Sequence, residues 1–338
     1  MTTVTEIANL LNLSKSTVSK ALNNKSDVSP ETRRCVLETA SSLGYTSSRK
    51  EKKTLAVFIK NMAYQRSSDF GYEIVHAFSK YCEKRDYSCE VIPLTDDLQY
   101  SRTYGAYMVE QGYAGALLLG LSLIDPWIST FKSARIPTVL FDNAVPKTDS
   151  IASVVCDADK GIDEAVQYLR SMGHTRIGLL TGPSSSYAVK QRYRAYIDTV
   201  SQAELDFDDS YIGMDYDYFT YMEQRIQQFI KNGITSIICT SDVRAQWAIA
   251  ACINQGLRVP QDMSIIGYDD LPSAKQYTPR LTTIHQDRSS IGKSCFAVLD
   301  ALINGIPIDS VVIKTRLIVR DSTGTAPNTE QQKKQPLS

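Results

Sequence analysis

The sequence predicts a small helix-turn-helix head followed by a large α/β body. Within residues 1–45, three short amphipathic segments each begin with helix-capping residues, and from Thr54 onward short apolar runs alternate with amphipathic stretches. The first pattern is typical of three packed helices, and the second of doubly wound parallel sheets. With 338 residues, the chain is long enough for two or three domains with well-buried cores.

The first predicted helix has a start signal and a stop signal. Thr3 and Glu6 have the spacing of a capping box, in which each side chain satisfies a free backbone N–H group. Apolar residues of the segment 4–11 form one stripe at helical spacing. Asn12 follows, and asparagine tolerates the left-handed backbone of a tight turn.

The second predicted helix, Lys15 to Leu22, contains no acidic residue. Ser14 can cap it, and its outward residues are all small or basic hydrogen-bonding residues: Lys15, Ser16, Thr17, Ser19 and Lys20. Ser29-Pro30-Glu31 opens a third helix, which Gly44 ends. An acid-free second helix of this kind suits the major groove of DNA. The alternative is a small helical cap on a larger domain, and periodicity alone does not decide between the two.

Charge is distributed unevenly, although the net charge is zero. Residues 1–53 hold nine Lys and Arg against five acidic residues, and the remainder is mildly acidic. A basic head on an acidic body is expected for a phosphate-contacting module joined to a solute-binding body.

The composition excludes several other classes of protein. The seven cysteines are odd in number, scattered and without a C-x-x-C pair, which predicts reduced thiols in a cytoplasmic protein and neither disulfides nor a zinc site. No phosphate-binding glycine motif is present, so we expect no cofactor and no metal. We expect no secretion signal and no membrane segment, because no apolar run is long enough.

Seven short apolar runs predict buried parallel strands, and the stretches between them predict helices. The strands are expected at 55–59, 89–94, 115–121, 137–141, 177–182, 236–241 and 264–270. The helices are expected at 74–85, 161–172, 187–203, 221–232 and 243–255. These elements suffice for two sheets, and ligands of such folds bind outside the carboxyl ends of the strands.

Specific motifs resemble the LacI/GalR (lactose-repressor) family of bacterial transcription regulators. In the head, these are S-K-S-T-V-S-K-A-L-N (14–23) and V-S-P-E-T-R-R-C-V (28–36). In the body, they are I-P-T-V-L-F-D (136–142), the run from Ala165 to Pro183, Q-R-Y-R-A-Y (191–196), D-M-S-I-I-G-Y-D-D (262–270), P-R-L-T-T-I-H-Q-D (279–287) and R-D-S-T-G (320–324). The resemblance covers nearly the whole chain.

The resemblance implies a body of the periplasmic-binding-protein type, with two subdomains, three chain crossings and an effector in the cleft between the subdomains. Carried over, subdomain one is 55–157 with 286–316, and subdomain two is 158–285 with 317–324. Residues 325–338 have no apolar periodicity and are expected to be disordered.

The resemblance also implies the residues that bind DNA. Lys15, Ser16 and Lys20 match base-reading positions. Backbone-positioning contacts are expected from Thr5, Ser14, Thr17, Ser19, Asn23 and Ser29.

Three effector-binding positions carry over from the family, namely Asp142, Arg192 and Asp269. An arginine flanked by two carboxylates suits a polyhydroxylated ligand, because ionised groups make the stronger hydrogen bonds. For each residue the alternative role is a structural salt bridge. Weaker candidates at other strand ends or crossovers are Ser241, Asp242 and Gln286.

Two segments depart from the family pattern. The loop Lys60–Phe70 is about four residues longer than usual, and we expect its residues Tyr64, Gln65, Arg66, Asp69 and Phe70 to reshape one wall of the pocket. Arg66 would also suit an anionic group such as a sugar phosphate. The linker 46–54 lacks the family's hinge-helix pattern and contains no Leu and no Ala. We expect it to be a flexible basic arm whose Arg49 and Lys50 contact phosphates.

These observations predict a homodimeric, ligand-responsive regulator, more specifically a repressor of carbohydrate-related genes. Its expected partners are a near-palindromic double-stranded operator and a sugar, a sugar phosphate or a purine. One alternative is a solute-binding protein for sugar uptake, which would have no use for residues 1–45. Another alternative is an enzyme, for which no nucleophile–base pair, metal-ligand cluster or phosphate loop is apparent.

Overall fold

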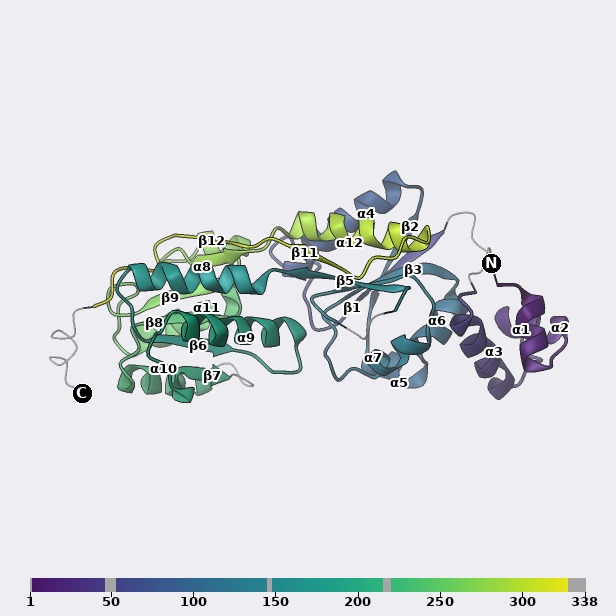
Figure 1. The fold of residues 1–338 in the computed structure, drawn as a ribbon, viewed down its shortest axis with the longest axis horizontal. Helices are drawn as coiled ribbons and strands as arrows, with labels where there is room; N and C mark the ends of the chain where they lie inside the picture. The colour runs from purple at the N-terminus through teal and green to yellow at the C-terminus, as the bar shows by residue number, and fades with distance from the viewer. Residues whose placement is uncertain (1, 46–52, 145–147, 215–219, 328–338) are drawn as a thin grey trace. The chain divides into compact units, whose positions relative to one another are not determined.

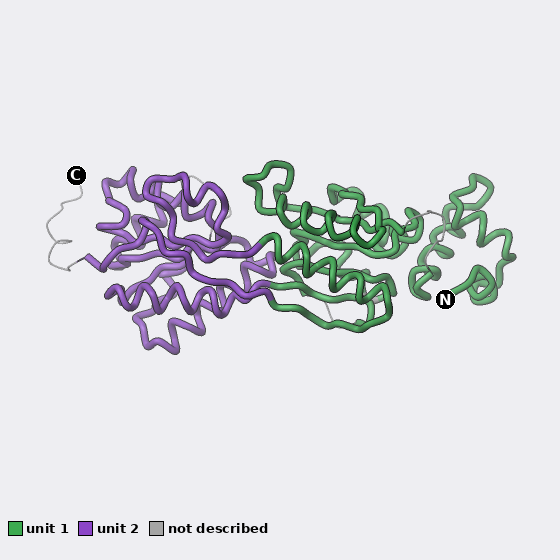
Figure 2. Tube along the Cα trace, turned by 90° about the horizontal axis from the view of Figure 1, so that it is seen from above, with its two compact units in different colours: residues 1–155, 288–312 green, residues 156–287, 313–338 purple. Residues whose placement is uncertain are grey.

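The computed structural model describes residues 2–45, 53–144, 148–214 and 220–327, and its helices and strands are labelled in Figure 1. The described chain forms two compact units. Unit 1 comprises residues 1–155 and 288–312, and unit 2 comprises residues 156–287 and 313–338 (Figure 2). No described helix has the length and apolarity needed to cross a membrane.

The head consists of α1 (Val4–Leu11), α2 (Lys15–Leu22) and α3 (Pro30–Ser42). The predicted capping box is present, since Thr3 Oγ1 accepts from Glu6 N at 3.3 Å and Glu6 Oε2 accepts from Thr3 N at 2.8 Å. Asn12 has a φ of 54°, as the predicted tight turn requires. The buried core of the head is formed by Ile7, Ala8, Val18, Ala21, Leu22, Val36, Leu37 and Ala40.

Unit 1 also contains a six-stranded sheet in the order β11-β5-β4-β3-β1-β2. The strands are β1 (Thr54–Ile59), β2 (Ser88–Pro93), β3 (Tyr113–Leu119), β4 (Thr138–Phe141), β5 (Ile151–Cys156) and β11 (Ser310–Ile313). The helices α4 (Phe70–Lys84) and α12 (Arg288–Ile303) pack together on one face. The other face carries α5 (Asp96–Ser101), α6 (Tyr104–Gln111), α7 (Pro126–Thr130) and a short 3-10 turn at Phe131–Ser133 (Figure 1).

Unit 2 contains a second six-stranded sheet in the order β12-β10-β9-β8-β6-β7. The strands are β6 (Ile177–Thr181), β7 (Ile212–Met214), β8 (Ser236–Cys239), β9 (Ser264–Asp269), β10 (Thr282–His285) and β12 (Arg316–Ile318). The helices α8 (Ala158–Ser171) and α9 (Tyr187–Gln202) share one apolar layer with the sheet, and α10 (Thr220–Lys231) and α11 (Asp242–Asn254) share the other. Short 3-10 turns lie at Asp209–Tyr211 and Pro272–Lys275.

The prediction of two parallel sheets with helices on both faces is confirmed. The chain passes between the two units after residues 155, 287 and 312. One crossing lies between β11 and β12, because β11 joins the sheet of unit 1 and β12 that of unit 2. The strands β5, β7, β10, β11 and β12 and the helices α5, α6, α7 and α12 were not predicted. Four of these five strands have at most four residues or alternate in burial, so they lack the long apolar run by which the others are recognised.

Candidate DNA-binding surface and effector site

The second head helix presents the predicted base-reading residues to solvent. Lys15, Ser16 and Lys20 are exposed, whereas Val18, Ala21 and Leu22 of the same helix are buried in the head. This division arises because the apolar residues recur at helical spacing and leave one polar face. α2 itself contains no acidic residue, so nothing on this helix repels a phosphate backbone.

Several predicted backbone-positioning residues also serve as caps. Ser14 Oγ accepts from Thr17 N at 3.0 Å, and Ser29 Oγ accepts from Thr32 N at 3.1 Å. Asn23 Nδ2 donates to Ser19 O at 2.6 Å. These residues therefore fix the ends of α2 and the start of α3, and their predicted contacts with the DNA backbone stay a prediction. Thr5, Thr17 and Ser19 are half-buried on the first two helices, and the predicted contacts of Arg49 and Lys50 lie outside the described residues.

Lys20 is engaged by a carboxylate that follows α2. Its Nζ lies 2.5 Å from Asp27 Oδ2, and both side chains are about half exposed. The hydrogen bond from Lys20 lowers the pKa of Asp27. The acid-free face of α2 thus has an acidic neighbour from outside the helix, and the predicted base contact of Lys20 would require this ion pair to open.

The second group of predicted residues lies in unit 2, where parallel strands end side by side. Thr240 and Ser241 follow β8, Asp269 ends β9, and Gln286 follows β10. Because β8, β9 and β10 are neighbours in the sheet, these strand ends are adjacent. This is the edge of a doubly wound sheet at which ligands bind.

Arg192 projects from α9 into this edge and is 7% exposed. Its Nη1 donates to Thr240 O at 2.7 Å and lies 3.6 Å from Asp269 Oδ1. The guanidinium carbon lies 3.7 Å from the centre of the Tyr268 ring, a cation–π contact. The guanidinium group is thereby held in one orientation at the strand ends.

Asp269 has an unusual backbone and a buried partner. Its φ is 116°, a region that favours glycine, and such strain is retained mainly where surrounding structure enforces it. Gln286 is fully buried, and its Nε2 donates to Asp269 Oδ1 at 2.7 Å. Gln286, after the neighbouring strand β10, therefore positions the carboxylate of Asp269 through this hydrogen bond.

Asp242 has a different role from the one expected. It is fully buried, and its carboxylate accepts from Leu271 N at 2.7 Å and from Thr283 Oγ1 at 2.5 Å. Burial, with the nearby charge of Asp269, raises its pKa. Because no part of Asp242 is exposed, its expected contact with an effector is corrected to support of the loop after β9. Ser241 caps α11, since its Oγ accepts from Arg244 N at 3.2 Å.

The structure adds Arg244, which the sequence analysis did not single out. Arg244 is 7% exposed, in the first turn of α11, and its Nη1 lies 3.3 Å from Ser241 Oγ. Gly182, after β6, leaves room for it, since a β-carbon there would lie 2.5 Å from Arg244 Nη2. The available signal was an arginine directly before the largely apolar stretch 245–252. A second guanidinium group thus stands at the same strand ends as Arg192.

In unit 1, the four predicted effector residues lie in two segments: Tyr64, Arg66 and Phe70 in the segment 60–70, and Asp142 after β4. Asp142 follows β4 with a φ of 45°, and the preceding Phe141 stacks on Phe70, with ring centres 6.2 Å apart. Tyr64, in the loop before α4, is half-buried, and its Cβ would lie 3.0 Å from a β-carbon at residue 71. Arg66 is exposed, and its backbone N donates to Asp69 Oδ2 at 2.9 Å.

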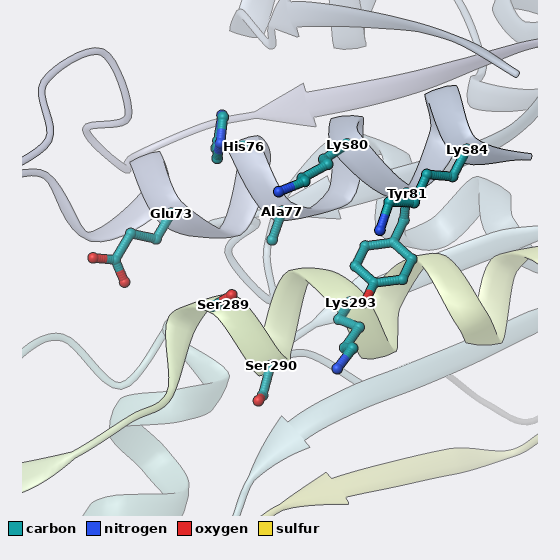
Figure 3. Close-up of a pocket in the computed structure, with 9 residues that line it drawn as sticks. All are labelled: Glu73, His76, Ala77, Lys80, Tyr81, Lys84, Ser289, Ser290 and Lys293. Carbon is teal, nitrogen blue, oxygen red and sulfur yellow. The ribbon is translucent and has the colours of Figure 1, made fainter.

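A basic groove between α4 and α12 contains none of these predicted residues (Figure 3). It is lined by Glu73, His76, Ala77, Lys80, Tyr81, Lys84, Ser289, Ser290 and Lys293. The ammonium groups of Lys84 and Lys293 lie 4.9 and 5.8 Å from the centre of the Tyr81 ring. The groove is therefore separate from the predicted effector residues of unit 1.

Comparisons with known proteins assign the chain to a family. Residues 3–48 match the model of bacterial regulatory proteins of the lacI family, and residues 166–323 match a periplasmic binding protein-like domain. The HTH-type transcriptional repressor PurR of Escherichia coli O139:H28 (strain E24377A / ETEC) is 30% identical over 97% of this chain and 98% of the relative. This chain belongs to the LacI family. As a LacI-family member, it is a ligand-responsive, DNA-binding transcription repressor.

Solved structures show the same LacI-family fold. A transcriptional regulator CelR–cellobiose complex has a TM-score of 0.70 and 24% identity, covering 95% of this chain and all of that chain. The Lac repressor dimer bound to operator and the anti-inducer ONPF has a TM-score of 0.68 and 24% identity, covering 96% and 99%. The family match of the head gives residues 1–45 a role that a solute-binding protein for uptake would lack.

Proposed function

We propose that this protein is a homodimeric repressor that reads a near-palindromic operator through α2 of each head and answers to a small effector. The observation that carries the DNA-binding half is the exposed, acid-free face of α2, whose ends are fixed by Ser14 and Asn23. Two such heads related by two-fold symmetry read two half-sites. Because its partner is operator DNA, we place the protein in the cytoplasm.

The effector site that we propose centres on Arg192 and Asp269, with Ser241 and Thr240 beside them. A buried guanidinium 3.6 Å from a carboxylate offers fixed donors and acceptors to a polar ligand. Neighbouring hydroxyls of a sugar meet this requirement, which supports a sugar-like effector. The resemblance to the CelR–cellobiose complex supports the same class. Tyr64, Arg66, Phe70 and Asp142 stay proposed contacts from unit 1, and the cleft between subdomains stays a prediction.

A second effector class is favoured by Arg244. Two buried guanidinium groups at one set of strand ends suit an anion, since arginine binds phosphate and carboxylate with parallel hydrogen bonds. This favours a phosphorylated sugar. The similarity to the PurR repressor keeps a purine as a further candidate.

A thermal-shift screen of sugars, sugar phosphates and purines separates these classes. A ligand at a hundred times its dissociation constant stabilises the fold by roughly 2.7 kcal/mol. We expect Arg192→Ala to remove the shift for any true effector. We expect Arg244→Met to remove it only for a phosphorylated one. A screen in which neutral sugars give a shift and sugar phosphates do not would reject the anionic class.

Selection of DNA from a random duplex pool tests the other half. We expect the wild-type protein to enrich two inverted half-sites. A pool that stays random after several rounds would contradict operator binding.

A further inference from the structure

The head is packed against its own lobe in unit 1. α3 lies alongside α6, and the core residues of the head belong to the same apolar cluster as Tyr104, Met108 and Ala134 (Figure 1). Leu43 and Tyr45, at the end of the head, pack against this cluster. The head therefore contacts the lobe through apolar side chains as well as through the linker.

The closest approach is between Ser41 of α3 and Gly105 of α6. A β-carbon at residue 105 would lie 1.9 Å from Ser41 Oγ and 2.8 Å from Ser41 Cβ, so only glycine permits this spacing. Ser41 is 3% exposed, although it is polar and lies near the end of its helix. The two helix surfaces are thus complementary at one defined point.

A main-chain hydrogen bond fixes the same contact. Arg135 N, just after the turn at Phe131–Ser133, donates to Ser41 O at 3.1 Å. The same carbonyl group, in the last turn of α3, also accepts from Gly44 N at 3.1 Å, so the lobe supplies a second donor at the end of this helix. Both the helix face and the helix end of α3 are therefore held by the lobe.

The docked head leaves its DNA-reading face uncovered. Lys15, Ser16 and Lys20 of α2 are exposed while Leu37, Ala40 and Ser41 of α3 are buried. Docking through α3 is consequently compatible with DNA contact through α2.

We propose that the lobe surface around Gly105 and Arg135 is a docking surface for the head of the same chain, and that this contact fixes the direction of the head on DNA. The linker 46–54 has no apolar residue between Ser47 and Lys53 that could form the buried face of a helix, so a linker helix is not expected to orient the head. We assign the orientation of the head to the docking contact instead. The inference rests on the proposed operator-binding function. The head then moves with the lobe, and the half-site separation is set by the lobes.

The first experiment measures docking without DNA. One spin label is attached to the exposed Cys35 of α3, and the other to a cysteine introduced by Ile124→Cys on the lobe, where Ile124 is 82% exposed. The measurement gives the distribution of distances between the two labels, and an excess of unlabelled protein suppresses distances between different molecules. We expect one narrow distribution for the wild type and a broad one for Gly105→Ala. The double variant Gly105→Ala with Ser41→Gly should narrow it again, because removal of the serine side chain makes room for the added methyl group. Ser42→Val is the matched control, since Ser42 is the exposed neighbour of Ser41.

The second experiment measures its consequence on DNA. DNA is selected from a random 40-base-pair pool. We expect half-sites at one separation to be enriched by the wild type, by Ser42→Val and by the double variant. We expect Gly105→Ala to enrich half-sites at several separations. A broad wild-type distance distribution, or one fixed separation for a Gly105→Ala variant shown to be undocked, would overturn the inference. If no half-site is enriched by the wild type while its distance distribution is narrow, operator binding fails and docking stands, but the role of docking on DNA is rejected.

Discussion

The ammonium group of Lys20 and the carboxylate of Asp27 form an ion pair at 2.5 Å on the side of the head that we predict to face DNA. Both groups are about half exposed, so the pair contributes little to stability. Its importance lies in DNA binding, because Asp27 competes with DNA for a lysine expected to read bases. A carboxylate at this place also repels phosphates.

We expect Asp27→Asn to strengthen DNA binding. The substitution frees Lys20 and removes one negative charge, so affinity for random duplex should rise about three- to tenfold at low salt, with the gain shrinking as salt rises. Fluorescence anisotropy at several salt concentrations measures this. Glu38→Gln, an exposed acid on α3, is the control. An equal gain in the control would mean that only net charge matters.

We expect Lys20→Ala and Ser16→Ala to relax sequence specificity. A lost base contact costs about 1–3 kcal/mol of discrimination, whereas a lost phosphate contact weakens binding to all sequences alike. Affinities for the duplex obtained by selection from the random pool and for a scrambled duplex distinguish a base contact from a phosphate contact. Equal losses on both duplexes for Lys20→Ala would reject the base-reading role.

We expect Arg192→Ala to abolish the effector response and to leave operator binding intact, because the two sites are joined only by coupling free energy. Operator affinity with and without the ligand found in the screen is the measurement. Arg194→Ala is the control, since Arg194 is on the same helix but 73% exposed and paired with Asp198. A retained response in Arg192→Ala would make Arg192 a structural residue.

We expect acid to destabilise unit 2 through Asp270. Burial raises the pKa of Asp270, but hydrogen bonds from His285 at 2.9 Å and Arg320 at 2.5 Å outweigh it and lower the pKa to about 2. Because the pKa of this carboxyl group is lower in the folded chain than in the unfolded chain, where it is near 3.9, the ionised group stabilises the fold at pH values above about 3.9. This stabilisation is lost as the pH falls towards 2. The contribution is about 2 kcal/mol at neutral pH.

Asp270→Asn should therefore be less stable at pH 7 and lose less on acidification. Urea unfolding between pH 7 and pH 2.5 measures both. The control is Asp321→Asn, because Asp321 pairs with Arg280 at 2.6 Å but its side chain is 48% exposed. The same pH profile for Asp270→Asn and the wild type would contradict this account.

We expect the linker to make DNA affinity strongly dependent on salt and to bend the operator little. Each phosphate neutralised adds roughly one to the slope of log affinity against log salt. Replacement of Arg49, Lys50, Lys52 and Lys53 by serine should lower this slope. The control replaces four exposed basic residues of unit 2: Lys190, Arg194, Lys231 and Lys275. An unchanged slope would make the linker a passive tether, and a sharp central kink in bound DNA would contradict the absence of an apolar wedge.

The sequence by itself determined the head and the sheets. The helices α1 and α2 and the start of α3 could be placed because their caps act within three residues of each helix start, as Thr3, Ser14 and Ser29 do. The central strands could be placed because strands buried on both faces need continuous apolar runs, as in Leu55–Ile59. Motif resemblance supplied Arg192 and Asp269, whose contact at 3.6 Å then emerged in the structure.

Only the tertiary structure decided which polar residues meet. Asp242 was expected to face a ligand, but the packing of β10 and the loop after β9 buries it beneath Thr283 and Leu271. The place of Arg244 at the strand ends could not be predicted, because it depends on the space that Gly182 leaves on another element. The contact between Ser41 and Gly105 has the same origin, since it joins segments 64 residues apart. Local spacing fixes helices and strands because their hydrogen bonds and caps are local, whereas a site forms where distant elements pack, and no short-range pattern encodes that packing.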